Sequence, residues 1–451
     1  MIDFSFEKDI NRYQSAWKNL KGKTYYHENS DVLSLDVHGF YGCGKREFIR
    51  QLIQGNRNKD ISYFSFRGLD NSSALSLFCK QYLENYQADD CDSAVKQYSK
   101  LYSAKYHLFI IDTDKDNEAY NSFFSAWNKE NNPEHTFTAY IYDEAPDMWF
   151  KEGNIMPRSI VDYIKVLPTL NKSDIVRLHG LTGGIPAVAR EMDADKSYED
   201  NLRILLRHGS AFSNLLPEIL TRLFRSPESY HPLIYQIAIG KHRLSEIAKS
   251  VGFPNNKCGK YLEALIKAGL VEANREEQKS YARYYLTNSY LYSWYLYIYR
   301  NQTLQIMDPQ ALYDRVVKSI DDLIAIPALH DSCARYVYNQ VYKDRYLLFD
   351  HYMKGITKSL HLKHMDGFKL TFDCVIHKGY RTLLCVFPRS LNEKYTKDEL
   401  KYYIKAAQTF GSLNDDVTLF VFSMNRFSDW CVHEAALTPQ LFCVPVERLK
   451  Y

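Results

Sequence analysis

Hydrophobic and polar positions in the first part of the chain follow two periods, which predict alternating strands and helices. Residues 32–37 and 61–66 alternate as strands, and apolar positions between 48 and 53 and between 75 and 82 recur at helical spacing after them. Strands that alternate with helices are typical of a parallel sheet. We therefore expect an α/β domain over residues 1–195.

The turn between the first strand and its helix has the composition of a phosphate-binding loop. Gly39, Gly44 and Lys45 match the pattern G-x-x-x-x-G-K, and Gly42 lies inside it. In such a P-loop the main-chain N–H groups point at phosphate oxygens, the helix N-terminus adds its dipole, and the lysine reaches the β- and γ-phosphates. We expect ATP or ADP to bind here. The competing interpretation is an ordinary glycine turn between a strand and a helix.

The position after Lys45 departs from this motif. A serine or threonine hydroxyl normally ligates Mg²⁺ there, but this chain has Arg46. A guanidinium group has donors and no acceptor, so it cannot ligate a cation, although it pairs well with phosphate. The sequence thus predicts a nucleotide site that includes Arg46, and it leaves the use of Mg²⁺ open.

Two later strands end in an acid and compete for the Walker B position, where an aspartate holds the metal. One ends at Asp112 and the other at Asp143. We favour Asp112, because a helix over residues 121–128 and a further strand leave Asp143 in the sensor position. The acid that would activate water is missing, since Thr113 follows Asp112. For both acids the structural alternative is a strand-end side chain that caps the next turn.

A family resemblance becomes specific between residues 165 and 187. Residues 181–187, with the sequence L-T-G-G-I-P-A, resemble the L-T-G-G-x-P segment of archaeal-type ATPases in the STAND branch of AAA-like P-loop proteins. Residues 165–170 resemble the stretch before it. The resemblance implies an AAA-like P-loop NTPase domain that binds ATP. Because Arg46 and Thr113 depart from the family at catalytic positions, the resemblance supports the fold better than it supports hydrolysis.

Residues 231–300 have a pattern of two helices and a returning strand that is typical of a winged helix-turn-helix. We assign residues 196–305 to a helical linker and this module. Its second helix would present Asn256, Lys257 and Lys260 to the major groove of duplex DNA, where such side chains contact bases and phosphates. Alternatively, the module only packs against the ATPase domain. The apolar face of the second helix is expected to contain Tyr261, Leu262, Leu265 and Ile266.

Residues 306–451 have an order of strands and helices that resembles the restriction-endonuclease-like domain often found at the C-terminus of this family. Such PD-(D/E)xK nucleases need an aspartate on one strand and Glu-x-Lys on the next, the acids for metal and the lysine for the transition state. Asp373 matches the first acid within a strand expected over residues 369–376. Cys385 and Phe387 stand where the other acid and the lysine belong. We expect a degenerate, structural or partner-binding domain.

Composition limits the classes to consider. A chain of 451 residues suggests two or three domains, with a linker expected around Met307-Asp308-Pro309. The net charge of +3 is too small to indicate a nucleic-acid partner by itself. Nine cysteines without C-x-x-C pairs argue against a zinc site and for a reducing compartment. We expect a cytoplasmic protein, because no signal peptide is visible and no apolar run approaches the roughly 20 residues that span a membrane.

Together these patterns predict a nucleotide-responsive regulatory or scaffold protein that hydrolyses ATP poorly or not at all. One alternative is an active ATPase that drives domain rearrangement. The other is a DNA-binding regulator whose winged helix is functional and whose P-loop is vestigial. The expected partners are duplex DNA and an unidentified protein, with no membrane.

Overall fold

The structure is a computed structural model and describes residues 4, 6–21, 35–56, 60–83, 86–102, 107–113, 117–130, 136–142, 155–275, 282–343, 360–363, 369–378, 381–392, 395–413 and 416–450. The chain forms two compact units. The first contains Ser5–Met156, and the second contains Pro157–Tyr451 together with Met1–Phe4. The expected domain boundaries at residues 195 and 305 stay predictions.

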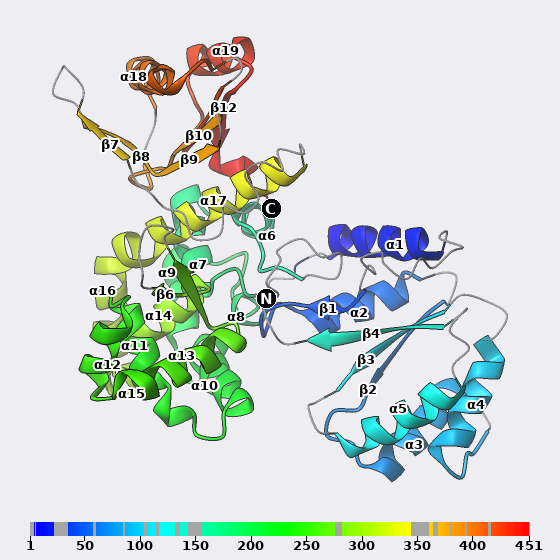
Figure 1. Ribbon diagram of the computed structural model, residues 1–451. Helices are drawn as coiled ribbons and strands as arrows, with labels where there is room; N and C mark the ends of the chain where they lie inside the picture. Colours follow the sequence, from blue (N-terminus) through cyan, green and yellow to red (C-terminus); the bar gives the residue numbers. More distant parts are fainter. Residues whose placement is uncertain are drawn as a thin grey trace. The chain divides into compact units, whose positions relative to one another are not determined.

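The Ser5–Met156 unit is built on a four-stranded parallel sheet with the order β1-β4-β3-β2. This confirms the predicted α/β class with a parallel sheet. Helices α1 and α2 lie on one side of the sheet and α3, α4 and α5 on the other (Figure 1). The elements are α1 (Glu7–Lys21), β1 (Val37–His38), α2 (Lys45–Gln54), β2 (Ile61–Ser65), α3 (Asn71–Tyr82), α4 (Cys91–Tyr102), β3 (His107–Asp112), α5 (Glu118–Glu130) and β4 (Thr136–Tyr142).

The central strand β3 is apolar because both of its faces are covered. Phe109 and Ile111 belong to the core that the sheet forms with α3, α4 and α5, together with Phe64, Phe78 and Trp127. Leu108 and Ile110 alternate with them and are also buried, as the two-residue period of a strand requires. Half of the first expected strand, residues 32–34, lies outside the described residues, and β1 begins only at Val37.

The strand order determines which candidate residues share an edge of this sheet. All four strands are parallel, so their carboxyl ends lie at one edge, where ligands of open α/β sheets bind. The loop after β1 and Asp112 at the end of β3 therefore lie at the same edge, with β4 between them. Asp143, the alternative Walker B residue, lies outside the described residues.

The second unit begins with a largely helical section. A short antiparallel hairpin, β5 (Val271–Arg275) and β6 (Ala282–Leu286), follows helices α12 and α13. A π-helix of five residues, η2 (Asp321–Ala325), connects α16 (Pro309–Ile320) to α17 (Ile326–Lys343). The helices are α6 (Ile160–Val166), α7 (Lys172–Thr182), α8 (Pro186–Ala189), α9 (Tyr198–Leu206), α10 (Ala211–Leu223), η1 (Pro227–Ser229), α11 (His231–Ala238), α12 (Leu244–Val251), α13 (Asn255–Lys267), α14 (Ser289–Tyr297), α15 (Gln302–Met307), α16 (Pro309–Ile320) and α17 (Ile326–Lys343).

The same unit ends in a second sheet with the order β12-β11-β10-β9. Strands β10, β11 and β12 are parallel, and β9 is antiparallel to β10. Buried residues of α18 and α19 pack on this sheet. The elements are β7 (Leu360–Lys363), β8 (Lys369–Phe372), β9 (Cys374–Lys378), β10 (Arg381–Val386), α18 (Lys397–Ala407), η4 (Gln408–Phe410), β11 (Val417–Ser423), α19 (Asp429–Leu437), β12 (Leu441–Pro445) and η5 (Val446–Arg448).

Two local expectations need correction, the position of Ile266 and the strand over residues 369–376. Ile266 is 36% exposed, so the apolar face of α13 is formed by Cys258, Leu262 and Leu265 instead. Residues 307–309, where a linker is expected, connect α15 to α16, and the Asp308 side chain caps the helix that Pro309 begins. Their role as a boundary between domains stays a prediction. The strand expected over residues 369–376 is two strands, interrupted at Asp373.

No helix within the described ranges is long and apolar enough to cross a membrane.

Candidate functional site

The loop between β1 and α2 follows a course that side chains would block. Gly39 has φ 156°, and a Cβ atom there would lie 2.5 Å from the Ile155 carbonyl oxygen. Gly44 has φ 87°, and its Cβ would lie 2.7 Å from the ring of Phe6. Gly42 also has a positive φ, 85°. The glycines therefore allow a tight loop immediately before a helix, which is the main-chain arrangement that a phosphate cradle needs.

Lys45 is the first residue of α2, and its side chain turns back under the loop. Its Nζ donates hydrogen bonds to the carbonyl oxygens of Gly39 at 2.8 Å and Phe40 at 3.2 Å, and the residue is buried. Gly44, the N-cap residue, has no side chain to accept bonds from the first-turn N–H groups of α2. A lysine ammonium group and a helix N-terminus thus converge on one loop, which suits an anion.

Asp112 is the centre of a group of donors from three elements. Arg46 Nε donates to Oδ2 at 2.7 Å, and Arg67 Nε donates to Oδ1. The Tyr63 hydroxyl lies 3.0 Å and the Ser65 hydroxyl 3.4 Å from Oδ2. The Asp112 side chain is 0% exposed, whereas those of Arg46 and Arg67 are 52% and 19% exposed.

The electrostatics of this group keep Asp112 ionised. Burial alone would raise the pKa of Asp112, but the hydrogen bonds and charges of Arg46 and Arg67 outweigh it and hold that pKa below its ordinary value. Burial, followed by the nearby charge of Asp112, raises the pKa of Tyr63 to about 12. Tyr63 is therefore protonated at neutral pH and donates to the carboxylate.

The residues present do not fit a magnesium ion. Mg²⁺ needs oxygen ligands in near-octahedral geometry, yet both oxygens of Asp112 accept bonds from guanidinium groups. Arg46 offers no ligand in place of the usual hydroxyl. Among the described residues, no three His, Cys, Asp or Glu side chains gather in a way that could hold a metal ion.

Sequence reasoning missed part of this group. It singled out Asp112 and Arg46 and expected Arg46 beside phosphate, whereas the structure places the Arg46 guanidinium on Asp112. Arg67 and Tyr63 were not foreseen. One signal was present: Ser65 is the register partner of Asp112, and Tyr63 lies two residues earlier on the same face of β2. Two polar residues on one face near the end of an apolar strand indicate a polar neighbour.

In the second unit, the L-T-G-G-I-P segment joins two helices. Gly183 ends α7 in the left-handed conformation, and its carbonyl accepts a bond from Asn288 Nδ2 at 3.0 Å, just before α14. The Gly184 carbonyl accepts the main-chain N–H of Arg158 at 2.7 Å. Thr182 Oγ1 and the Tyr163 hydroxyl are 2.5 Å apart. Here the motif has a structural role, because it hydrogen-bonds the end of α7 to the residue just before α14.

The three candidate DNA-binding residues lie in the first two turns of α13 and are exposed. Lys257 Nζ lies 4.3 Å from the centre of the Phe253 ring, a cation–π contact that holds its stem against the preceding turn. Asn256 Oδ1 accepts the main-chain N–H of Lys257 at 2.8 Å. The structure thus brings Asn256, Lys257 and Lys260 to one end of one helix.

Asp373, the acid expected of a nuclease-like domain, is buried between β8 and β9. Its Oδ2 accepts the main-chain N–H of Phe387 at 2.7 Å, and Arg389 donates to both of its oxygens. Helix α17 packs beside it, since His330 Nε2 lies 2.7 Å from the Pro388 carbonyl oxygen. Asp373 therefore orients the chain after β10.

Comparisons with known proteins add little to this geometry. No protein-family model matches the chain. An uncharacterized protein of Methanocaldococcus jannaschii is 24% identical over 176 residues, which are 38% of this chain and 37% of that protein. The match thus spans little more than a third of the relative's length.

Two solved structures are weakly similar. A chain from the structure of Drosophila ORC bound to AT-rich DNA and Cdc6 is 9% identical, covers 64% of this chain and 93% of its own, and has a TM-score of 0.21. A protein from Vibrio cholerae is 11% identical, covers 92% of this chain and 94% of its own, and has a TM-score of 0.18. Both scores are too low for either likeness to carry an argument about fold or function.

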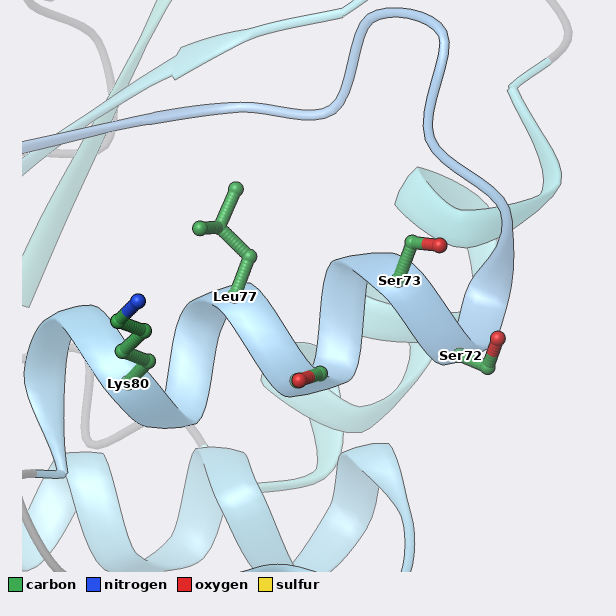
Figure 2. A pocket seen from close by; sticks show the side chains of 5 residues that line it. Ser72, Ser73, Leu77 and Lys80 are labelled. Carbon is green, nitrogen blue, oxygen red and sulfur yellow. The ribbon is translucent and has the colours of Figure 1, made fainter.

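A hollow lies elsewhere on the Ser5–Met156 unit, over the outer face of α3 (Figure 2). It is lined by Ser72, Ser73, Ser76, Leu77 and Lys80 and has a volume of about 610 Å³. These residues alternate along the helix with the buried Ala74, Phe78 and Cys79. The hollow shares no residue with the Gly39–Lys45 loop or with the Asp112 group, so it does not extend the candidate site.

Proposed function

We propose that the Ser5–Met156 unit is a P-loop nucleotide-binding domain that holds the phosphates of ATP or ADP without a metal ion. The observation that carries this proposal is the position of Lys45, buried at the start of α2 with its Nζ against the carbonyls of its own glycine loop. An arriving phosphate would replace these carbonyls as the partner of the ammonium group. The open N-terminus of α2 would supply main-chain donors.

Weak or absent hydrolysis follows from the same residues. Phosphoryl transfer to water needs a group that orients or deprotonates the nucleophile, usually beside a bound metal. Thr113 stands where the acid belongs, and Asp112 is engaged by two arginines. The chain is thus better suited to respond to bound nucleotide than to turn it over, and we propose a regulatory or scaffold role. An active ATPase is the alternative.

We further propose that residues 196–305 contain a winged helix-turn-helix. Support comes from the order α11, α12, α13, β5, β6 and from the exposed Asn256, Lys257 and Lys260 at the start of α13. A regulator that binds duplex DNA through this helix is therefore the second candidate function. Residues 306–451 would form a degenerate nuclease-like domain, since Arg389 and Phe387 engage the remaining acid.

The proposal is tested by isothermal titration with ADP and ATP, in Mg²⁺ and in EDTA. We expect the wild type to bind equally in both, and Lys45→Ala to weaken binding by about 10- to 100-fold, because a charge-assisted hydrogen bond is lost. Arg50→Ala is the matched control: it removes one positive charge from α2, but at a side chain that pairs with Glu47 on the outer face. If the wild-type protein binds nucleotide neither in Mg²⁺ nor in EDTA, the loop is only a structural turn.

A further inference from the structure

Arg67 is held in place by the main chain around it. It follows β2 in a turn, where the N–H of Phe66 donates to the Asp112 carbonyl at 2.7 Å. Asn117 Nδ2 donates to the Phe66 carbonyl at 2.8 Å. The turn is therefore fixed against the end of β3, and the guanidinium group of Arg67 lies on Asp112 Oδ1 with 19% of its side chain exposed.

Arg46 is placed differently. It belongs to the first turn of α2 beside the loop, and its side chain is 52% exposed, against 19% for Arg67. Its acceptor, Asp112 Oδ2, also accepts from Tyr63 and Ser65 and would keep these bonds if Arg46 left. For Oδ1, in contrast, Arg67 is the donor among the described residues.

We propose that Arg67 is a positioning residue that takes the place of a metal ion in the nucleotide site. By holding Asp112 Oδ1 it prevents this carboxylate from ligating Mg²⁺, and it leaves Arg46 as the mobile cation that moves from Oδ2 to a nucleotide phosphate. This inference rests on the proposed nucleotide binding, and it explains why nucleotide would bind at that site without Mg²⁺.

The physical reason is competition for a buried carboxylate. A buried charge needs a partner, and Asp112 has no exposed surface through which water could serve as one. A magnesium ion about 2.1 Å from Oδ1 would place its charge against the guanidinium cation that already donates to the same atom, so the two cations compete for one carboxylate oxygen. As Arg67 is covalently attached and always charged, it outcompetes a dilute ion.

The test compares ADP affinity in EDTA and in Mg²⁺ for the wild type, Arg67→Ala, Arg67→Gln and Arg67→Lys. We define the ratio as the dissociation constant in EDTA divided by that in Mg²⁺, and we expect it to be near one for the wild type. Without the guanidinium, Oδ1 becomes free for Mg²⁺ and the ratio should rise about tenfold or more in the Ala and Gln variants. Arg67→Lys keeps a cation and should restore a ratio near one, a rescue that a purely structural role does not predict. Arg67→Gln serves if the alanine variant fails to fold.

Asp112→Asn provides an independent measurement. It removes the charge that holds Arg46, so binding in EDTA should stay equal or tighten, whereas a metal-ligand role predicts that Mg²⁺-dependent binding weakens. The inference is overturned if the wild type binds ADP while the Arg67 variants keep a ratio near one. Wild type that binds in neither condition overturns the proposed function itself, and this inference with it.

Discussion

Arg389 donates two hydrogen bonds to Asp373, from Nη1 to Oδ1 at 2.6 Å and from Nη2 to Oδ2 at 2.9 Å. The same relationship occurs in the other unit, where Arg46 and Arg67 engage the two oxygens of Asp112. In both units, the acid that the sequence singles out as a metal ligand is paired with guanidinium. An arginine that forms such bonds satisfies the carboxylate and competes with a metal cation for it.

The pairing at Asp373 predicts that the protein does not cut nucleic acid. Supercoiled and linear DNA incubated with the protein and Mg²⁺ or Mn²⁺ should remain intact, because Cys385 and Phe387 add no ligand or lysine to the lone acid. Gel electrophoresis measures this. Cleavage that disappears in Asp373→Ala would show that the domain is an active nuclease.

Removal of a lysine at the start of α13 should weaken DNA binding in a particular way. In Lys260→Ala, the slope of log affinity against log salt should fall by about one unit, and affinity should fall alike on all duplex sequences, because a phosphate contact is lost. Fluorescence anisotropy with labelled duplexes measures both. Lys267→Ala, at the exposed far end of the same helix, is the control and should change neither. Absence of wild-type binding at low salt would restrict the module to a packing role.

Alanine substitutions at two glycines that end helices distinguish the cost of a left-handed backbone from the cost of a steric clash. Gly183 and Gly252 have similar φ values, 62° and 72°, but a Cβ at Gly183 would lie 1.8 Å from Asn288 Oδ1, whereas one at Gly252 meets nothing within 4 Å. Gly252→Ala should cost about 1–2 kcal/mol for the left-handed conformation. Gly183→Ala should cost about 2 kcal/mol more, because Asn288 must move. Urea unfolding measures the free energy of unfolding of each variant. Equal losses in the two variants would argue against a close contact between Gly183 and Asn288 at the start of α14.

Buried His179 should make the stability of the second unit depend on pH. Its Nε2 lies 3.0 Å from the Arg158 carbonyl, and burial lowers its pKa from 6.5 to about 4. The unfolded chain takes up the proton first as pH falls, so stability is complete above the unfolded pKa and is lost as pH falls from about 7 toward 4, by about 2 kcal/mol at pH 5.

The comparison variant is His179→Gln, which keeps a side-chain amide donor but does not titrate. Urea unfolding at pH 7.5 and pH 5 should show a smaller loss of stability in the variant than in the wild type. Equal losses in the two proteins would assign the pH dependence to other groups.

Local patterns in the sequence determined much of the fold. The strand at 61–65 and helix α3 lie where alternation and helical spacing predict them, because these periods report which positions face a core. The strand at 107–112 ends at Asp112 as expected, because a short apolar run that ends in an acid is typical of a buried parallel strand. The glycine loop before Lys45 was likewise visible, since positive φ restricts residue type locally. Local reasoning misplaced Ile266 and the break at Asp373, where packing and a single buried acid decide the outcome.

Only the tertiary structure decided which groups meet the functional acids. Arg46 and Arg67 are 66 and 45 residues from Asp112 in sequence, and Gly183 is 105 residues from Asn288. Nothing in the local sequence around Asp112 shows that two guanidinium groups reach it, because the register of β2 against β3 and the position of α2 on the sheet bring them there. The residue types predicted an anion-binding loop with a damaged metal site. The fold supplies the physical reason: a buried carboxylate binds the nearest cation fixed in the structure, and here that cation is arginine.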